Sequence, residues 1–473
     1  MASQRSRVAS GSFANVVQMV LGFIVVVAFS RHLGSAEIGV YFFVLSIVAT
    51  LDGGINGIIA ALKKRISEQD ANRDEILGAL GIILIPISIT FSILIFVGMS
   101  ALNGNWDPRV PQLVAILFAP FVIATSITRM IIGISEVGKA KWLQTSRTAF
   151  RAVVQFALIG LGTTGLVIGN TIGIVVFLVI GLFVLGIYPS IPSRETLRLI
   201  WEYARYSIPS GIVGRLNDST DQMIIGLLFV SSTVGLYGVA ARLVAPALLI
   251  TSVIQGSLET KVSNLHSGGH EVKKAIRENM SFTAILSIPL FFGSLAIGDH
   301  IIAVIFGDEF TGAYLFLVVL AFSRVVKSLA SPMTSIIGSL DCPSVVFRIN
   351  LASSMVLLVG CFGMGIAIGG VGVALGIVAA IMTRFVLCVN FLHPRVGIKN
   401  LVTRQFFEQV GAGFIMLIIT YAWDQSTVVT GWMETGILIG IGGVVYFLVL
   451  LTMSPEFRDL ARGVTEDFYS SSM

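Results

Sequence analysis

Charged residues and cysteines are scarce in this sequence. Only 12% of its 473 residues are charged, against roughly a quarter in an average soluble domain, whereas 55% are hydrophobic. With a mean hydropathy of +0.91, the chain has too few polar side chains to cover a water-exposed surface, so a lipid bilayer must be its solvent. The three cysteines, Cys342, Cys361 and Cys388, lack the spacing of a disulfide framework or of a metal site.

Complete motifs for catalysis, nucleotide binding or metal binding are also missing. The run from Gly133 to Lys139 comes within one residue of a phosphate-binding loop, but Ala140 replaces the required Ser or Thr, and the run leaves a membrane helix rather than a strand. The five histidines lie in or near loops without clustered partners. We therefore predict no enzyme activity, no cofactor and no metal, and expect the basic loops to meet anionic lipid rather than nucleic acid.

Apolar spans long enough to cross a bilayer recur along the whole chain. Lys and Arg in the connecting loops fall almost entirely on one side, leaving only Arg31 and Arg109 on the other, which places both termini in the cytoplasm. We predict an all-α polytopic protein of the cell membrane with about fourteen transmembrane helices, at residues 11–30, 38–61, 76–99, 110–134, 142–162, 165–187, 206–229, 235–258, 281–298, 313–337, 344–368, 371–392, 406–423 and 434–452.

The two halves of the chain repeat each other. Gly39-Val-Tyr matches Gly235-Leu-Tyr, and Gly165-x-x-x-Gly matches Gly372-x-x-x-Gly, a pattern that lets helices approach closely. Because six helices return the chain to the same side, the repeats are parallel, an arrangement known from transporters, although duplicated bundles also form channels or scaffolds. We divide the chain into a six-helix lobe at 1–195, a second at 196–395 and a terminal helix pair with a cytoplasmic tail at 396–473.

Cationic side chains inside the predicted spans are the main candidates for function. Each costs about 2.5–3.5 kcal/mol at a helix centre, so they must face protein or a wet cavity. Arg129, Arg147 and Arg348 lie near cytoplasmic helix ends, where snorkelling explains them. The candidates for lining a substrate cavity are Arg215, Arg242, Arg324 and Lys327, together with Arg151 and Arg384 at intermediate depth.

Carboxylates inside the spans are fewer. Asp52, Asp218 and Asp221 are candidates for coupling transport to a proton or sodium ion, and Asp218 can also pair with Arg215 on one helix face in a purely structural role. Since cations outnumber anions, we expect an anionic ligand, and a phosphate or pyrophosphate group suits arginine, which can bind it through two hydrogen bonds.

Several short motifs resemble those of the prokaryotic polysaccharide-export flippases (the Wzx-like family). Arg31–Gly34 followed by Glu37–Tyr41 looks like the R-x-L-G…G-x-Y opening of that family, and Ile305–Phe310 resembles its I-F-G-x-x-F signature. Lys64–Glu68 is similar to archaeal members. The resemblance covers about residues 10–395 and includes Tyr206–Pro209, Asp221–Gly226 and Val234–Ala240, whereas the terminal pair fits only by helix count.

The resemblance implies a MATE-like fold and a function. Such a protein moves a lipid-linked oligosaccharide, carried on a polyprenyl or dolichyl phosphate, from the cytoplasmic to the outer leaflet by alternating access, for surface polysaccharide or protein N-glycosylation. Its partners would be membrane lipids and glycan-assembly or oligosaccharyltransferase machinery. One alternative is a MATE-type antiporter for cationic drugs, which would need buried carboxylates with little positive charge. The other is a membrane glycosyltransferase or polymerase, which would need an acidic site near an outer loop; Asp308 and Glu309 are the candidate pair for it, in a short loop.

Overall fold

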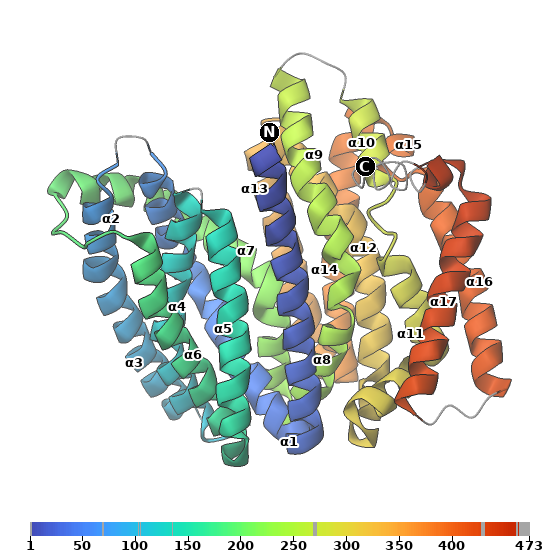
Figure 1. The fold of residues 1–473 in the computed structure, drawn as a ribbon, viewed down its shortest axis with the longest axis horizontal. Helices are drawn as coiled ribbons and strands as arrows, with labels where there is room; N and C mark the ends of the chain where they lie inside the picture. The colour runs from blue at the N-terminus through green and yellow to red at the C-terminus, as the bar shows by residue number, and fades with distance from the viewer. Residues whose placement is uncertain are drawn as a thin grey trace. The chain divides into compact units, whose positions relative to one another are not determined.

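The computed structural model describes residues 2–68, 71–102, 104, 106–134, 136–267, 272–426, 431–459 and 462, and every regular element in these ranges is a helix (Figure 1). The predicted fold class, an all-α polytopic membrane protein, is confirmed. Ten helices of the described residues are long and apolar enough to cross a bilayer, or eleven if the bent pair Ser231–Leu243 and Ala245–Gln255 is one span. The predicted number of fourteen is not confirmed.

The chain consists of two units, an N-terminal unit (Met1–Gly238) and a C-terminal unit (Val239–Met473). The predicted division at 195 and 395 remains a prediction, because it rests on the repeats and not on contacts. The helices of the N-terminal unit are α1 (Ala2–Ile66), α2 (Arg73–Ala79), α3 (Ile85–Ala101), α4 (Val110–Gly133), α5 (Val137–Ala157), α6 (Gly162–Leu185), α7 (Arg194–Leu228) and the start of α8 (Ser231–Leu243).

Helix α1 contains two of the predicted spans. It is kinked at Gly34, whose backbone (φ 77°, ψ 176°) lies in a region that side-chain-bearing residues rarely adopt. The kink lets the chain reverse without a loop, so spans 11–30 and 38–61 become two segments of one continuous element. Helices α5 and α7 correspond to two further predicted spans, but their charged residues keep them below the hydropathy of an apolar span. These two features explain most of the difference in helix number.

A polar cluster fixes the chain just beyond this kink. Glu37 accepts a hydrogen bond from Arg109 Nη2 (2.8 Å) and another from the backbone N–H of Thr163 (2.7 Å) at the start of α6. Arg109 also donates to both oxygens of Asp107, at 3.0 and 2.8 Å. These hydrogen bonds hold the pKa of the Asp107 carboxyl below its usual value. The cluster ties α1 to the α3–α4 connection and to α6.

The C-terminal unit holds the remaining helices: α9 (Leu249–Ser267), α10 (Lys273–Met280), α11 (Ser287–Phe306), α12 (Tyr314–Ser339), α13 (Pro343–Ile368), α14 (Gly370–Val396), α15 (Ile398–Leu401), α16 (Arg404–Ser426) and α17 (Trp432–Met453). Helices α16 and α17, the predicted terminal pair, pack against α11: a Cβ on Gly413 would lie 2.4 Å from the Phe292 ring. The small-residue pattern marks close helix approach in both units, since a Cβ on Gly169 would lie 2.8 Å from Gln155, and one on Gly376 would lie 2.5 Å from the Cys361 nitrogen.

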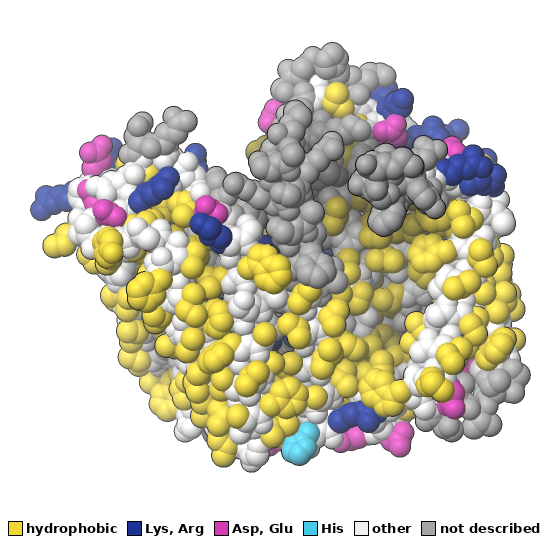
Figure 2. Space-filling view, viewed as in Figure 1, with side chains coloured by type: hydrophobic (Ala, Val, Ile, Leu, Met, Phe, Trp, Pro, Cys, Tyr) yellow, Lys and Arg dark blue, Asp and Glu magenta, His cyan; other side chains and the backbone are white. Residues whose placement is uncertain are grey.

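The lateral surface of the helices is hydrophobic. Figure 2 shows hydrophobic side chains over the flanks of the helices, whereas Lys, Arg, Asp and Glu gather toward the helix ends. On α3, for example, Ile93, Leu94 and Val97 are all more than half exposed. Aliphatic side chains exposed along a helix flank fit contact with lipid, and the chain is a multi-pass membrane protein, as the sequence predicts.

Candidate functional site

The sequence-predicted site residues fall in both units. Asp52, Arg151, Arg215 and Asp221 belong to the N-terminal unit, and Arg242, Arg324, Lys327 and Arg384 belong to the C-terminal unit. The side chain of Asp218 lies outside the described residues, so its predicted pairing with Arg215 and its ion-coupling role stay predictions.

The best-defined charged contact of the N-terminal unit joins Asp52 to Arg215. Arg215 Nη2, on α7, donates to Asp52 Oδ2, on the second segment of α1, across 2.9 Å. The Asp52 side chain is fully buried, whereas that of Arg215 is 24% exposed. Both residues were candidates from the sequence, but their pairing was missed, since 163 positions separate them.

Glycines bring α1 and α7 close enough for this pair to form. A Cβ on Gly53 would lie 2.8 Å from Arg215 Cβ, and one on Gly57 would lie 2.4 Å from the Ile208 backbone. Ser207 Oγ donates to the Gly57 carbonyl oxygen at 2.8 Å. We call this contact, from Gly53 and Gly57 on α1 to Ile208 and Arg215 on α7, the α1–α7 seam.

The repeated Gly-x-Tyr motifs meet beyond the seam. A Cβ on Gly39 would lie 1.8 Å from the Ser231 carbonyl oxygen and 2.9 Å from the Gly235 nitrogen, and one on Gly235 would lie 2.1 Å from the Ser35 carbonyl oxygen. The two glycines that match under the predicted repeat therefore pack directly against each other.

The Asp52–Arg215 pair is only half satisfied. Asp52 Oδ1 and Arg215 Nε are buried, and neither has a hydrogen-bond partner among the described residues. Arg129 on α4, which the sequence assigned to snorkelling, lies within electrostatic range of Asp52 and is itself exposed. The carboxylate thus contacts one cation and feels the charge of a second, and Arg215 uses one of its five N–H donors on it.

Asp221 has a different environment. It accepts a hydrogen bond from the hydroxyl of Tyr237, a fully buried residue of α8, and another from the backbone N–H of Gln222 at 2.9 Å. These bonds fix the connection between α7 and α8. Its ion-coupling role remains a prediction, and the contacts give it a structural one.

Helix α5 presents a polar stripe to the interior of the N-terminal unit. Arg147, Arg151 and Gln155 are spaced four residues apart and so share one helix face. Arg147 and Arg151 are close enough to repel each other, and Arg151 Nε is buried without a partner among the described residues. Gln155 donates to the Tyr41 hydroxyl at 3.0 Å, so the first Gly-x-Tyr motif also ends in a polar contact.

In the C-terminal unit, α12 carries the main polar stripe. Arg324 and Lys327 are half-buried one turn apart, and Arg324 Nε is buried without a partner among the described residues. Further along the helix, Ser328 bonds to Ser287 at 3.2 Å and Ser335 accepts from Gln255 at 2.8 Å. Elsewhere in this unit Arg384 is half-buried on α14, and Arg242 is exposed at the end of α8. Each unit thus carries cationic side chains that are partly buried in the protein.

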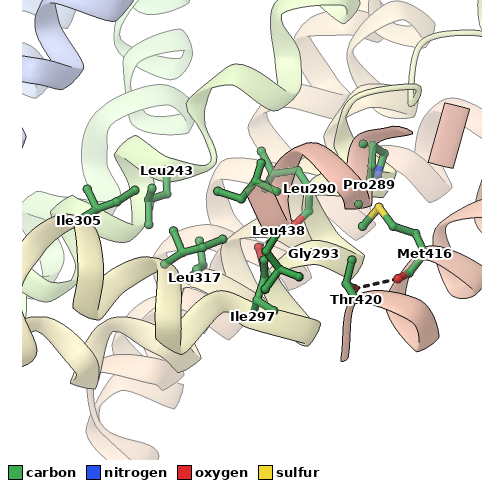
Figure 3. A pocket seen from close by; sticks show the side chains of 15 residues that line it. Leu243, Pro289, Leu290, Gly293, Ile297, Ile305, Leu317, Met416, Thr420 and Leu438 are labelled. Atoms are coloured by element: carbon green, nitrogen blue, oxygen red, sulfur yellow. Dashed lines mark hydrogen bonds between the residues drawn. The ribbon is translucent and has the colours of Figure 1, made fainter. Parts of the chain in front are cut away.

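The C-terminal unit also holds an apolar pocket of about 320 Å³ between α11, α16 and α17 (Figure 3). Its walls include Leu290, Ile297, Met416 and Leu438. The Thr420 hydroxyl, the most polar lining group that Figure 3 labels, donates to the Met416 carbonyl oxygen at 2.7 Å and so offers its proton to no ligand. The pocket therefore suits a hydrocarbon chain.

Comparison with solved structures identifies the fold. The chain superimposes on a structure described as lipid II flippase MurJ, inward closed conformation, with a TM-score of 0.77 and 16% identity, covering 95% of this chain and 99% of that one. An inward-facing multidrug resistance MATE family transporter gives a TM-score of 0.67 at 14% identity, with 80% and 95% coverage. The fold is the MATE-like fold that the motifs implied.

Comparison of sequences narrows the class of protein. A family model described as polysaccharide biosynthesis protein matches residues 109–315. The chain is 28% identical over 469 residues to the probable low-salt glycan biosynthesis flippase Agl15 of Haloferax volcanii, covering 95% of this chain and 97% of that relative. The resemblance to polysaccharide-export flippases, including archaeal ones, is confirmed.

Proposed function

We propose that the chain is a flippase that moves a lipid-linked oligosaccharide, carried on a polyprenyl or dolichyl phosphate, from the cytoplasmic to the outer leaflet of the cell membrane. The carrying observation is the sequence similarity, along nearly the whole chain, to a relative named as a probable glycan biosynthesis flippase. The MATE-like fold and the predominantly cationic charges of the predicted spans support the same function. The chain acts by transport and not by catalysis.

Arginine side chains are the proposed contacts for the anionic part of the substrate. Among the described residues, Arg215 donates one hydrogen bond to Asp52. A guanidinium has five N–H donors, so Arg215 retains donors for a phosphate. Arg324 and Lys327 supply a second cationic pair on α12. Arg151, Arg242 and Arg384 are proposed as further contacts along the path of the substrate.

The lipid part of the substrate needs an apolar surface. The pocket between α11, α16 and α17 accepts a segment of the isoprenoid chain, because its walls are mainly hydrocarbon and the Thr420 hydroxyl donates to a backbone carbonyl of its own helix. The rest of the tail stays in the bilayer against the hydrophobic helix flanks.

The proposed function also implies an orientation in the membrane and partners on its outer side. The excess of Lys and Arg in the loops on one side supports cytoplasmic N- and C-termini. The translocated glycan would then pass to oligosaccharyltransferase or to polysaccharide-assembly machinery on the outer side. Asp52, Asp218 and Asp221 are the proposed sites for any proton or sodium ion that drives the cycle. A cationic-drug antiporter is disfavoured, because a positively charged interior repels its substrates.

The test follows lipid-linked glycans in cells with and without the gene. Deletion should deplete the surface glycan and leave finished lipid-linked oligosaccharide on the cytoplasmic face, as read by mass spectrometry of vesicles of known sidedness. A plasmid copy should restore both. Unchanged surface and lipid-linked glycans in the deletion strain would refute the proposal, and drug-efflux assays would then examine the antiporter alternative.

A further inference from the structure

We propose that Asp52 is an internal substitute for the substrate's phosphate. Its carboxylate binds the Arg215 guanidinium when no substrate is bound, and the phosphate of an incoming substrate displaces it. The inference rests on the proposed function, since it presupposes an anionic lipid-linked substrate. It adds a specificity-determining residue that need not touch the glycan itself.

The geometry of the pair permits exchange. A carboxylate and a phosphate present oxygens to a guanidinium at the same distance, and the strongest complexes form two parallel hydrogen bonds. Here a bond of 2.9 Å joins Arg215 Nη2 to Asp52 Oδ2, while Arg215 Nε and Asp52 Oδ1 are buried and have no hydrogen-bond partner within the part of the chain that the structure describes. An anion that engages the guanidinium through two bonds is therefore better matched to Arg215 than Asp52 is.

An incoming ligand can reach Arg215 more easily than Asp52. Asp52 is fully buried, but about a quarter of the Arg215 side chain is exposed, so a phosphate reaches the cation from its open side. Once Arg215 turns away, the charge of Arg129 on α4 still acts on the carboxylate. This second cation matters because a buried carboxylate left without any partner strongly destabilises a protein.

The exchange requires only a local movement. The Arg215 Cβ and Cγ atoms are pressed against Gly53, where a Cβ would come within 2.8 and 3.0 Å of them. The stem of the side chain is thus fixed in the α1–α7 seam, and rotation about its outer bonds is enough to redirect the guanidinium. The ligand can be captured before the helices part.

The consequence is selectivity against ordinary membrane lipids. A bare arginine at this depth would bind the phosphodiester of any anionic phospholipid, since its attraction to phosphate does not depend on what the phosphate carries. With Asp52 in place, a ligand must displace a carboxylate. A lipid-linked glycan adds contacts of its sugars to those of its phosphate and meets this threshold, whereas a bulk lipid offers its headgroup charge alone.

The experiment measures binding of farnesyl phosphate and of phosphatidylglycerol to the purified full-length protein in neutral-lipid nanodiscs. Asp52→Asn should tighten binding of both probes by about tenfold, because a neutral amide oxygen holds the guanidinium less tightly than a carboxylate, whose hydrogen bond is roughly twice as strong. In an Arg215→Ala background the same substitution should have no such effect. Asp308→Asn, which removes an exposed carboxylate outside the seam, controls for net charge.

The outcomes separate the inference from the function. Unchanged or weaker binding by a folded Asp52→Asn protein, or a gain that persists without Arg215, would overturn the inference. If Asp52→Asn does not fold, Asp52→Ser provides the same test with a smaller neutral side chain. Flipping of lipid-linked glycan by the wild type in vesicles reports on the proposed function independently, so the function stands even where the Asp52 result is negative.

Discussion

Removing Arg215 should harm the protein in two separable ways. Arg215→Ala leaves the fully buried Asp52 carboxylate without its hydrogen-bonded partner, and breaking a buried pair in this manner costs about 3–5 kcal/mol. Arg215 is partly exposed, makes one described bond, and leaves Arg129 to compensate, so we expect the lower end, about 3 kcal/mol.

This loss of unfolding free energy determines the expected fall in Tm. For a unit of roughly 150–250 residues, each kcal/mol corresponds to about 2–4 °C in Tm, so the single variant should unfold roughly 6–12 °C lower in detergent. The double variant Asp52→Asn/Arg215→Ala should recover most of this loss, because no charge is left unpaired. Transport should not recover, since the phosphate contact is still missing.

The assay pairs thermal unfolding of the purified proteins with restoration of surface glycan in the deletion strain. A double variant that is stable but inactive, compared with an Asp52→Asn single variant that still transports, supports a role of Arg215 in substrate contact beyond its structural one. A double variant that restores surface glycan to the wild-type level would refute that reasoning and leave Arg215 as a structural residue.

The remaining predictions concern other parts of the chain. Arg324→Ala should abolish transport while membrane insertion stays intact, whereas Arg348→Ala, at an exposed position, should have little effect; surface-glycan staining with membrane quantification compares the two. Gly57→Val should cost about 1–3 kcal/mol by forcing apart backbones at the α1–α7 seam, and Gly98→Ala, which has open space around it, is the matched control in thermal unfolding. Asp107 has a lowered pKa in the folded protein, so its stabilising contribution is complete above its unfolded pKa of about 4 and disappears as the pH falls through the folded value. The fall in Tm below about pH 4 should therefore be shallower in Asp107→Asn, and an identical pH profile would contradict the assignment.

The sequence predicted the class of fold and the kinds of residues better than their arrangement. Hydropathy and loop charge were sufficient for an all-α membrane protein, because lipid exposure imposes the same requirement on every span. The number of spans was less accessible: Gly34 joins two of them into one kinked element, and charges in α5 and α7 blur the apolar signal. These depend on local backbone geometry and on burial, which hydropathy does not report.

Pairing of charges was the least predictable property. Asp52 and Arg215 stood out individually because an ionised side chain is costly in a membrane. Their contact depends on how α1 packs along α7, which in turn depends on Gly53 and Gly57 meeting a particular stretch of α7. A single sequence does not show which distant positions come into contact, so it offered Arg215 only the nearby Asp218, whose side chain lies outside the described residues.

The motifs that resemble those of the polysaccharide-export flippases have mainly structural roles here. Glu37, from the opening motif, binds Arg109 and Thr163; Gly39 and Gly235 pack together; and Tyr237 donates to Asp221. None of these contacts presents a free cation to a substrate. Arg215, Arg324 and Lys327, the proposed phosphate contacts, lie outside the quoted motifs. A fold held by one set of residues can therefore accept changes in the other, which explains why motifs of this kind resemble those of a family without defining a substrate. Exchanging the cations while keeping Glu37 and the two glycines should then alter substrate preference without loss of folding, whereas Gly39→Val should prevent folding whatever the substrate.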